Sequence, residues 1–192
     1  MNLPNKLTVA RLALTVVFVA CFYVPLPNAM SWALFIFSIA SITDYLDGYL
    51  ARKHNLVTNF GKLVDPLADK ILIAAAFILL VEKTEMKAWI AIAILGREFF
   101  VTGIRLVAAN QGVVLAAEKL GKHKMVWQII TVIFFMLKTA SNEPVFSWAS
   151  PLFASTVVNT YVGAALTYFT TALTLFSGYS YYSKNRHLFS DM

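Results

Sequence analysis

Long apolar stretches, separated by short polar or proline-containing turns, follow one another along the whole chain. We predict six helical spans, which cover approximately residues 8–27, 30–53, 62–82, 88–110, 122–140 and 151–183. A helix needs roughly 20 apolar residues to cross the hydrocarbon core of a bilayer. The last stretch is longer than that, so we expect it to be tilted or to project beyond the bilayer. The pattern predicts an all-α fold with six transmembrane helices.

Turn-forming residues stand between these stretches. Pro25, Pro27 and Asn28 mark the first turn, residues 82–85 mark the third, and residues 141–144 mark the fifth. We find no internal repeat and no low-complexity segment. The sequence therefore predicts a single membrane domain over residues 1–192.

Composition excludes a disordered chain and an ordinary soluble domain. The chain is 59% hydrophobic and 14% charged, with a mean hydropathy of +0.68. Residues 144–183 contain no Asp, Glu, Lys or Arg. The first apolar run leads directly into further spans, so we expect no cleavable signal peptide. The single cysteine, Cys21, lies in an apolar run and is expected to be a packed thiol.

The distribution of basic residues predicts the orientation of the spans. One set of predicted span ends carries Lys6, Arg11, Arg52, Lys53, Lys62, Lys119, Lys122, Lys124, Lys184 and Arg186. The other set carries Lys83, Lys87 and Lys138, offset by Glu82, Glu85 and Glu143. Cytoplasmic loops are enriched in Lys and Arg, so we expect a multi-pass protein of the cell membrane with both termini in the cytoplasm. This topology also accounts for the net charge of +6, and we do not expect nucleic acid as a partner.

Four aspartates stand close together at the predicted cytoplasmic ends of the second and third spans. Asp44 and Asp47 are three residues apart, and Asp65 and Asp69 are four apart, so each pair shares one helix face. Ionisable residues in a transmembrane segment are expensive and indicate a functional site. Four neighbouring carboxylates need cations to ionise together, and hard divalent metals prefer oxygen ligands. Two such metals about 4 Å apart are a common device for displacement at phosphorus.

Two structural interpretations of these residues remain open. The aspartates can form salt bridges with Arg52, Lys62 and Lys70, and Gly48 and Gly61 can serve close helix packing. Neither explains four acids on faces that also carry Gly48, Ala51 and Gly61, where a ligand can approach the backbone.

The spacing of this segment resembles that of a known enzyme family. From Asp44 to Asp69 the chain reads D-x-x-D-G-x-x-A-R, eight residues, then G-x-x-x-D-x-x-x-D, which matches the CDP-alcohol phosphatidyltransferases at every fixed position. The resemblance implies that Asp44, Asp47, Asp65 and Asp69 hold two divalent ions, Mg²⁺ or Mn²⁺. It also implies that Asp69 is the catalytic base. A nucleotide pocket is expected to be lined by Asn5, Thr8, Gly48, Ala51, Arg52 and Gly61.

Further segments resemble bacterial phosphatidylglycerophosphate synthases. They are residues 4–11, 65–70 and 121–124, and Arg97 and Glu98 together with Arg105. Met125 departs from the Thr that is more common in that family. The resemblance implies transfer of a phosphatidyl group from CDP-diacylglycerol to glycerol 3-phosphate, with CMP as the second product. It also implies contact with membrane lipids and a homodimer.

Basic residues suit a phosphorylated acceptor independently of the resemblance. A phosphate dianion needs cationic donors, and we expect Arg105, Lys122 and Lys124 to bind it. Alternatively, Lys119, Lys122 and Lys124 bind anionic lipid headgroups. Glu98 and Arg105 are seven residues apart on one helix face, so we expect them to pair, whereas Arg97 either pairs with an acid or contacts substrate.

Three rival functions remain. The same chemistry could use inositol phosphate or serine as the acceptor, although basic residues at the site disfavour serine. A membrane prenyltransferase also binds a diphosphate through Mg²⁺, but the D-x-x-D-G-x-x-A-R spacing argues against it. A metal transporter would use carboxylates as well, but transport sites tend to lie near the bilayer midplane.

Overall fold

The computed structural model describes the backbone of residues 3–54, 59–113, 115 and 119–186. The side chains of residues 3–7, 44–54, 59–67, 69 and 119 lie outside that description. The elements are α1 (Leu3–Tyr23), α2 (Ala29–His54), α3 (Asn59–Glu82), α4 (Ala88–Asn110), α5 (Lys119–Ala140), η1 (Pro144–Ala149), α6 (Ser150–Ala154), η2 (Val157–Val162) and α7 (Gly163–Lys184). The described residues form helices and turns without a strand, which confirms the all-α prediction.

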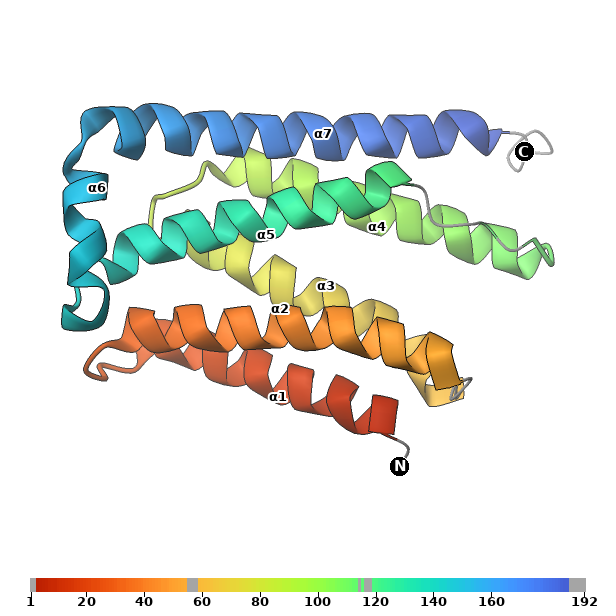
Figure 1. The fold of residues 1–192 in the computed structure, drawn as a ribbon. Helices are drawn as coiled ribbons and strands as arrows, with labels where there is room; N and C mark the ends of the chain where they lie inside the picture. Colours follow the sequence, from red (N-terminus) through yellow and green to blue (C-terminus); the bar gives the residue numbers. More distant parts are fainter. Residues whose placement is uncertain (1–2, 55–58, 114, 116–118, 187–192) are drawn as a thin grey trace.

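The long helices run side by side as a bundle (Figure 1). The turns at residues 24–28, 83–87 and 141–143 lie together at one end, on the left of Figure 1, which we call the turn end. The last turns of α2 and the first turns of α3, which carry the four aspartates, lie at the opposite end, which we call the aspartate end. The predicted turns are confirmed, although α1 ends at Tyr23, four residues before its predicted end.

The predicted single helix over residues 151–183 is wrong. The segments Pro144–Ala154 and Val157–Lys184 meet at an angle of 95°, and α6 lies across the turn end of the bundle (Figure 1). The break occurs at Ser155, whose backbone is extended (φ −67°, ψ 123°). The break falls at a serine and not at Gly or Pro, so the sequence pattern does not indicate it.

The apolar core and the packing of α7 differ in chemistry. Large side chains such as Phe18, Phe37 and Phe77, all fully buried, fill the space between the first helices. In contrast, α7 buries small and hydroxyl residues, namely Gly163, Thr167, Thr170, Thr171, Thr174, Ser177 and Gly178, together with Tyr181. Thr131 and Thr170 are hydrogen-bonded at 2.8 Å, which joins α5 to α7. Small residues and hydroxyls of this kind allow helices to approach closely in membranes.

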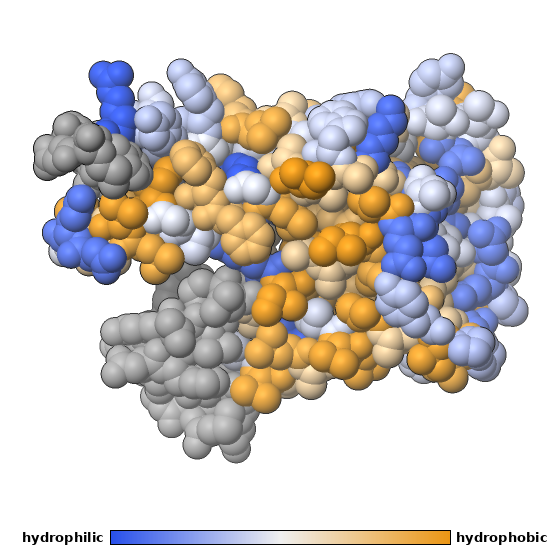
Figure 2. All heavy atoms as spheres, turned by 180° about the vertical axis from the view of Figure 1, so that it is seen from behind, coloured by the Kyte–Doolittle hydropathy of each residue, from blue (hydrophilic) through white to orange (hydrophobic). Residues whose placement is uncertain are grey.

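Large apolar side chains also cover much of the exterior. Val16, Ile92 and Trp148 are each about 70% exposed (70%, 69% and 69%). Figure 2 shows hydrophobic residues over the middle of one face and hydrophilic residues at the turn end. Among the described residues, Leu120–Ala140 alone is long and apolar enough to cross a membrane, and the bent pair Pro144–Ala154 and Val157–Lys184 could form a second span. Thr8–Tyr23 and Ala29–Thr43 are apolar but shorter. Six spans therefore stay a prediction.

Acidic residues tie the helices together at the turn end. The Glu143 carboxylate accepts hydrogen bonds from the backbone N–H groups of Met30 (2.9 Å) and Ser31 (2.8 Å). A carboxylate there satisfies N–H groups at the start of α2 and complements the helix dipole. Lys138 donates to Glu85 at 2.6 Å, and the hydroxyl of Tyr23 donates to Glu82. Glu82, Glu85 and Glu143, the acids that offset the lysines of this set of ends, thus join neighbouring helices.

Candidate functional site

The four predicted metal ligands lie on two consecutive helices. Asp44 and Asp47 belong to the C-terminal part of α2, and Asp65 and Asp69 belong to the N-terminal part of α3. All four positions fall within about three turns of the residues that connect the two helices. Their side chains lie outside the described residues, so the predicted metal site stays a prediction. Among the described residues, no group of three or more His, Cys, Asp and Glu could hold a metal ion.

The predicted nucleotide-binding residues are divided between α1, α2 and α3. Gly48, Ala51 and Arg52 belong to α2, Gly61 to α3 and Asn5 to α1, and their side chains also lie outside the described residues. Thr8 is described and is 2% exposed, on a helix that packs against both α2 and α3.

Arg11, one of the basic residues expected at the cytoplasmic ends, is buried. Arg11 is 2% exposed and lies three residues after Thr8, which is also buried. Thr15, one turn further on, is also buried, and its hydroxyl donates to the Arg11 carbonyl at 2.9 Å. Because of this three- and four-residue spacing, Thr8, Arg11 and Thr15 share the face of α1 that packs against α2 and α3. The charge pattern used to predict topology does not indicate this face.

Glu98 forms the centre of a buried ion network on α4. Its Oε1 is paired with Arg97 Nη1 at 3.3 Å and with the Lys124 ammonium on α5. Gln128 Nε2, one turn further along α5, lies 3.5 Å from the same oxygen. The Glu98 and Lys124 side chains are 12% and 8% exposed. A buried carboxylate with several charged and polar partners is typical of a site whose geometry is fixed in advance.

The network extends to α3 and α7. Lys70, which directly follows Asp69, has its Nζ 3.5 Å from the Glu98 carbonyl oxygen. Arg97 Nη2 donates to Ser177 at 2.8 Å, and Gln128 Nε2 donates to Thr174 at 3.3 Å. Neither Gln128 nor Ser177 belongs to a motif in the sequence. The acid–base pair Arg97–Glu98 inside an apolar stretch was the available signal.

A cavity of about 190 Å³ lies beside this network, between α3, α4 and α5. Its polar lining residues are Lys70, Glu98, Lys124 and Gln128, and its apolar lining residues are Ile73, Ala74, Leu95, Phe99 and Met125. We call it the Glu98 cavity. A pocket lined by both cationic and apolar groups suits a small anion with a carbon skeleton.

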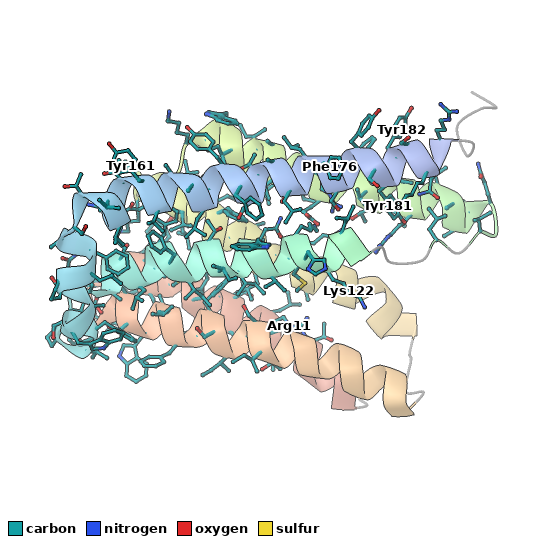
Figure 3. The ribbon with its side chains drawn as sticks, turned by 45° about the horizontal axis from the view of Figure 1, so that its top comes forward. Arg11, Lys122, Tyr161, Phe176, Tyr181 and Tyr182 are labelled. Atoms are coloured by element: carbon teal, nitrogen blue, oxygen red, sulfur yellow. The ribbon has the colours of Figure 1, made fainter. Side chains whose placement is uncertain are left out.

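The three predicted acceptor-phosphate residues occupy different surroundings. Lys124 lines the Glu98 cavity, whereas Lys122 is exposed on the first turn of α5 (Figure 3). Arg105 Nε donates to the Tyr181 hydroxyl at 3.2 Å, and the guanidinium lies 5.5 Å from the centre of that ring. The expected pairing of Glu98 with Arg105 is therefore wrong, because Glu98 instead pairs with Arg97 and Lys124.

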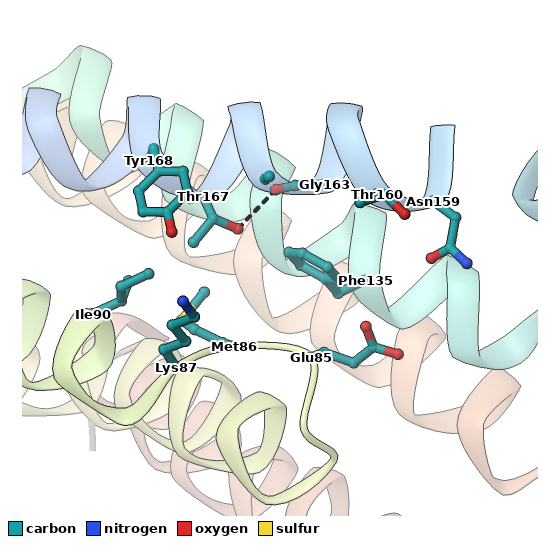
Figure 4. Close-up of a pocket in the computed structure, with 11 residues that line it drawn as sticks. Glu85, Met86, Lys87, Ile90, Phe135, Asn159, Thr160, Gly163, Thr167 and Tyr168 are labelled. Carbon is teal, nitrogen blue, oxygen red and sulfur yellow. Dashed lines mark hydrogen bonds between the residues drawn. The ribbon is translucent and has the colours of Figure 1, made fainter. Parts of the chain in front are cut away.

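A second cavity, of about 200 Å³, lies at the turn end (Figure 4). Glu85, Lys87 and Tyr168 contribute to its wall, together with Asn159 and Thr160 of η2. In Figure 4 the Thr167 hydroxyl donates within α7 to the Gly163 carbonyl, at 2.8 Å. We call this space the turn-end cavity, and its described lining includes none of the predicted site residues.

Comparisons with known proteins agree with the motif. The family model for CDP-alcohol phosphatidyltransferases matches residues 1–176. A CDP-diacylglycerol–glycerol-3-phosphate 3-phosphatidyltransferase of Bacillus subtilis (strain 168) is 44% identical over 196 residues, covering 96% of this chain and 95% of the relative. A protein of the same name from Rickettsia bellii is 35% identical, covering 98% of this chain and 97% of the relative. A cardiolipin synthase (CMP-forming) of Oryza sativa is 35% identical over 86% of this chain and 54% of the relative.

Proposed function

Because this chain belongs to the CDP-alcohol phosphatidyltransferase family, we propose that it transfers the phosphatidyl group of CDP-diacylglycerol to glycerol 3-phosphate. The acceptor hydroxyl oxygen bonds to the lipid-side phosphorus, the bond from that phosphorus to the bridging oxygen breaks, and CMP leaves. The observation that carries the choice of substrates is the 44% identity to the Bacillus subtilis enzyme over nearly the full length of both chains.

We assign Asp44, Asp47, Asp65 and Asp69 to two divalent ions, Mg²⁺ or Mn²⁺. Support comes from the donor set, because these four carboxylates stand on consecutive helices and hard cations prefer oxygen ligands. When bound, such ions neutralise the pyrophosphate and stabilise charge on the leaving group. Asp69 then takes the proton of the acceptor hydroxyl, which a positioned carboxylate can do as a general base. Asn5, Thr8, Gly48, Ala51, Arg52 and Gly61 are assigned to the cytidine nucleotide.

The acceptor phosphate is assigned to the basic residues Arg105, Lys122 and Lys124. Support is strongest for Lys124, since it lines the Glu98 cavity together with Lys70. Charge-assisted hydrogen bonds to a phosphate are about twice as strong as neutral ones. Arg105 and Lys122 are accessible to solvent, where they can attract the anion before it enters.

We further propose that the protein spans the membrane several times, with both termini in the cytoplasm, and that it forms a homodimer. The lengths of α1 to α5 and α7, between 21 and 26 residues, support the spans because about 20 residues cross a bilayer. Exposed apolar side chains over the middle of the bundle agree with this placement. Cysteine labelling of each turn in intact cells would test the topology, and mass photometry in detergent would test the dimer.

The function is tested by incubating purified protein with CDP-diacylglycerol, Mg²⁺ and one acceptor at a time. We expect CMP release with glycerol 3-phosphate and identification of phosphatidylglycerol phosphate by mass spectrometry. Inositol phosphate and serine form the comparison panel. Faster CMP release with another acceptor would reassign the substrate, and no CMP release with any of them would reject the reaction.

A further inference from the structure

Glu98 joins four helices at one point beside the Glu98 cavity. Its own helix is α4, its carboxylate pairs with Lys124 on α5, and its carbonyl oxygen lies near Lys70 of α3. Through Arg97 and Gln128 the same network reaches Ser177 and Thr174 of α7. A displacement of this carboxylate would therefore disturb the relative positions of the groups around the cavity.

Lys124 needs a nearby negative charge to remain at the cavity wall. Its side chain is 8% exposed, and burial of an ammonium without a counter-charge is strongly unfavourable. Arg97 shares the Glu98 oxygen, and Lys70 lines the same cavity, so both cations repel the Lys124 ammonium. Glu98 is the acidic side chain among the described lining residues of this cavity.

One donor of Lys124 is engaged by Glu98, and an ammonium has three. Because Lys124 lines the cavity, its remaining donors can serve an anion there. We infer that Glu98 is a positioning residue for the acceptor: its carboxylate holds the Lys124 ammonium at the cavity wall, where that ammonium binds the phosphate of glycerol 3-phosphate. This inference rests on the proposed function.

The decisive measurement compares KM for glycerol 3-phosphate, KM for CDP-diacylglycerol and kcat in Glu98→Gln, Glu98→Asp and Lys124→Gln. In Glu98→Gln the Lys124 ammonium loses its counter-charge and leaves the wall, so KM for glycerol 3-phosphate should rise about 10-fold, which corresponds to one lost contact. KM for CDP-diacylglycerol should change by less than about 2-fold, since the aspartates hold that substrate. Glu98→Asp keeps the charge and should restore most of the acceptor affinity.

The double variant Glu98→Gln/Lys124→Gln tests whether Glu98 acts through Lys124. We expect its KM for glycerol 3-phosphate to equal that of Lys124→Gln alone, because groups that act as a unit are not additive. Glu85→Gln is the matched control: it removes the partner of a second lysine of α5, at the other end of the bundle. It should leave both KM values unchanged.

Each alternative outcome has a defined meaning. An unchanged KM for glycerol 3-phosphate in Glu98→Gln, or a lower one, would overturn the positioning role, as would an additive double variant. If Glu98→Gln does not fold, the double variant and Glu98→Asp decide the question, because neither leaves Lys124 as a buried cation without a partner. A wild-type protein that releases no CMP with glycerol 3-phosphate would instead reject the proposed function itself.

Discussion

Two glutamate–lysine pairs hold the two ends of α5, and they differ in what surrounds them. At the turn end, Glu85 and Lys138 are 2.6 Å apart, with side chains 20% and 22% exposed. At the other, Glu98 and Lys124 are 12% and 8% exposed, and Arg97 and Gln128 share the same Glu98 oxygen. Each pair lies beside a cavity of nearly the same volume, about 200 Å³ and about 190 Å³. Cavity volume therefore does not distinguish a pair that only joins helices from a pair that belongs to a binding site.

Burial and the number of partners do separate them. The turn-end acids each close a connection, as Glu143 does by capping α2 and Glu85 by holding Lys138. Partly exposed pairs of this kind contribute little energy, typically about 0–1 kcal/mol. A buried cluster is costly to assemble unless every member is satisfied. Its presence next to the helix that carries Asp65 and Asp69 indicates a role beyond tethering.

The largest expected effect concerns the aspartate end. Excess EDTA should abolish CMP release, and added Mg²⁺ or Mn²⁺ should restore it, because four clustered carboxylates without cations repel the pyrophosphate. Asp44→Asn, Asp47→Asn and Asp65→Asn should each weaken binding of metal and CDP-diacylglycerol together. Asp69→Asn should lower kcat by about 10²-fold or more, with nucleotide binding better preserved.

Glu85→Gln is the control for that series, because it neutralises a carboxylate of the turn end. Its turnover should match that of the wild type. Full turnover in excess chelator would remove the metals from the mechanism, and near-normal kcat in Asp69→Asn would remove Asp69 as the base.

The second effect concerns the cations of the acceptor site. A charge-assisted contact contributes about 1.5–3 kcal/mol, so Lys124→Gln should raise KM for glycerol 3-phosphate by about 10- to 100-fold. Arg105→Gln and Lys122→Gln should have smaller effects, because Arg105 is held by Tyr181 and Lys122 is exposed. Lys138→Gln at the turn end should leave both KM values unchanged.

Repeating these measurements in neutral and anionic micelles distinguishes substrate binding from lipid binding. If Lys122 and Lys124 bind lipid headgroups, activity will fall only where anionic lipid is present, and KM for glycerol 3-phosphate will not move. Equal shifts in both KM values would reopen the choice of acceptor.

The sequence was sufficient to predict the long helices and their turns, because apolar length and Pro–Asn or charged turns are local signals. It was insufficient for the break at Ser155, where neither Gly nor Pro marks the change of direction. The aspartate motif and the family could also be recognised from one segment, because residue types at fixed spacing along two helices define the motif.

Partner choice within the bundle was not readable in the same way. Glu98 and Arg105 share a helix face, but Glu98 pairs with the neighbouring Arg97 and with Lys124, which lies 26 residues away on α5. Arg11 was grouped by charge with the basic residues of the span ends, and its burial was not specified by that pattern. Such contacts depend on how helices rotate against one another, which a single-helix pattern does not specify.

A third prediction concerns the seam between α4 and α7. A Cβ added at Gly178 would lie 2.7 Å from Arg97 Cγ, so Gly178→Ala must shift the Arg97 side chain, which contacts Ser177 and Glu98. Overpacking of this kind typically costs about 1–3 kcal/mol. Gly103→Ala is the matched control on α4, because nothing lies within 4 Å of its Cβ position. In thermal unfolding in detergent, the midpoint should fall for Gly178→Ala but not for Gly103→Ala. Equal midpoints for the two variants would contradict this packing.

The smallest effect is expected at the turn-end pair. Glu85→Gln and Lys138→Gln should each lower stability by about 1 kcal/mol or less, since both side chains retain access to solvent. In a protein of this size that corresponds to a fall of about 2–4 °C or less in the unfolding midpoint. The double variant should lose no more than either single variant, because the two changes remove the same contact. High salt should reduce the difference from wild type, since screening weakens accessible pairs more than buried ones. If instead either variant changes KM for glycerol 3-phosphate as Lys124→Gln does, the turn end takes part in acceptor binding, and the division between tether and site fails.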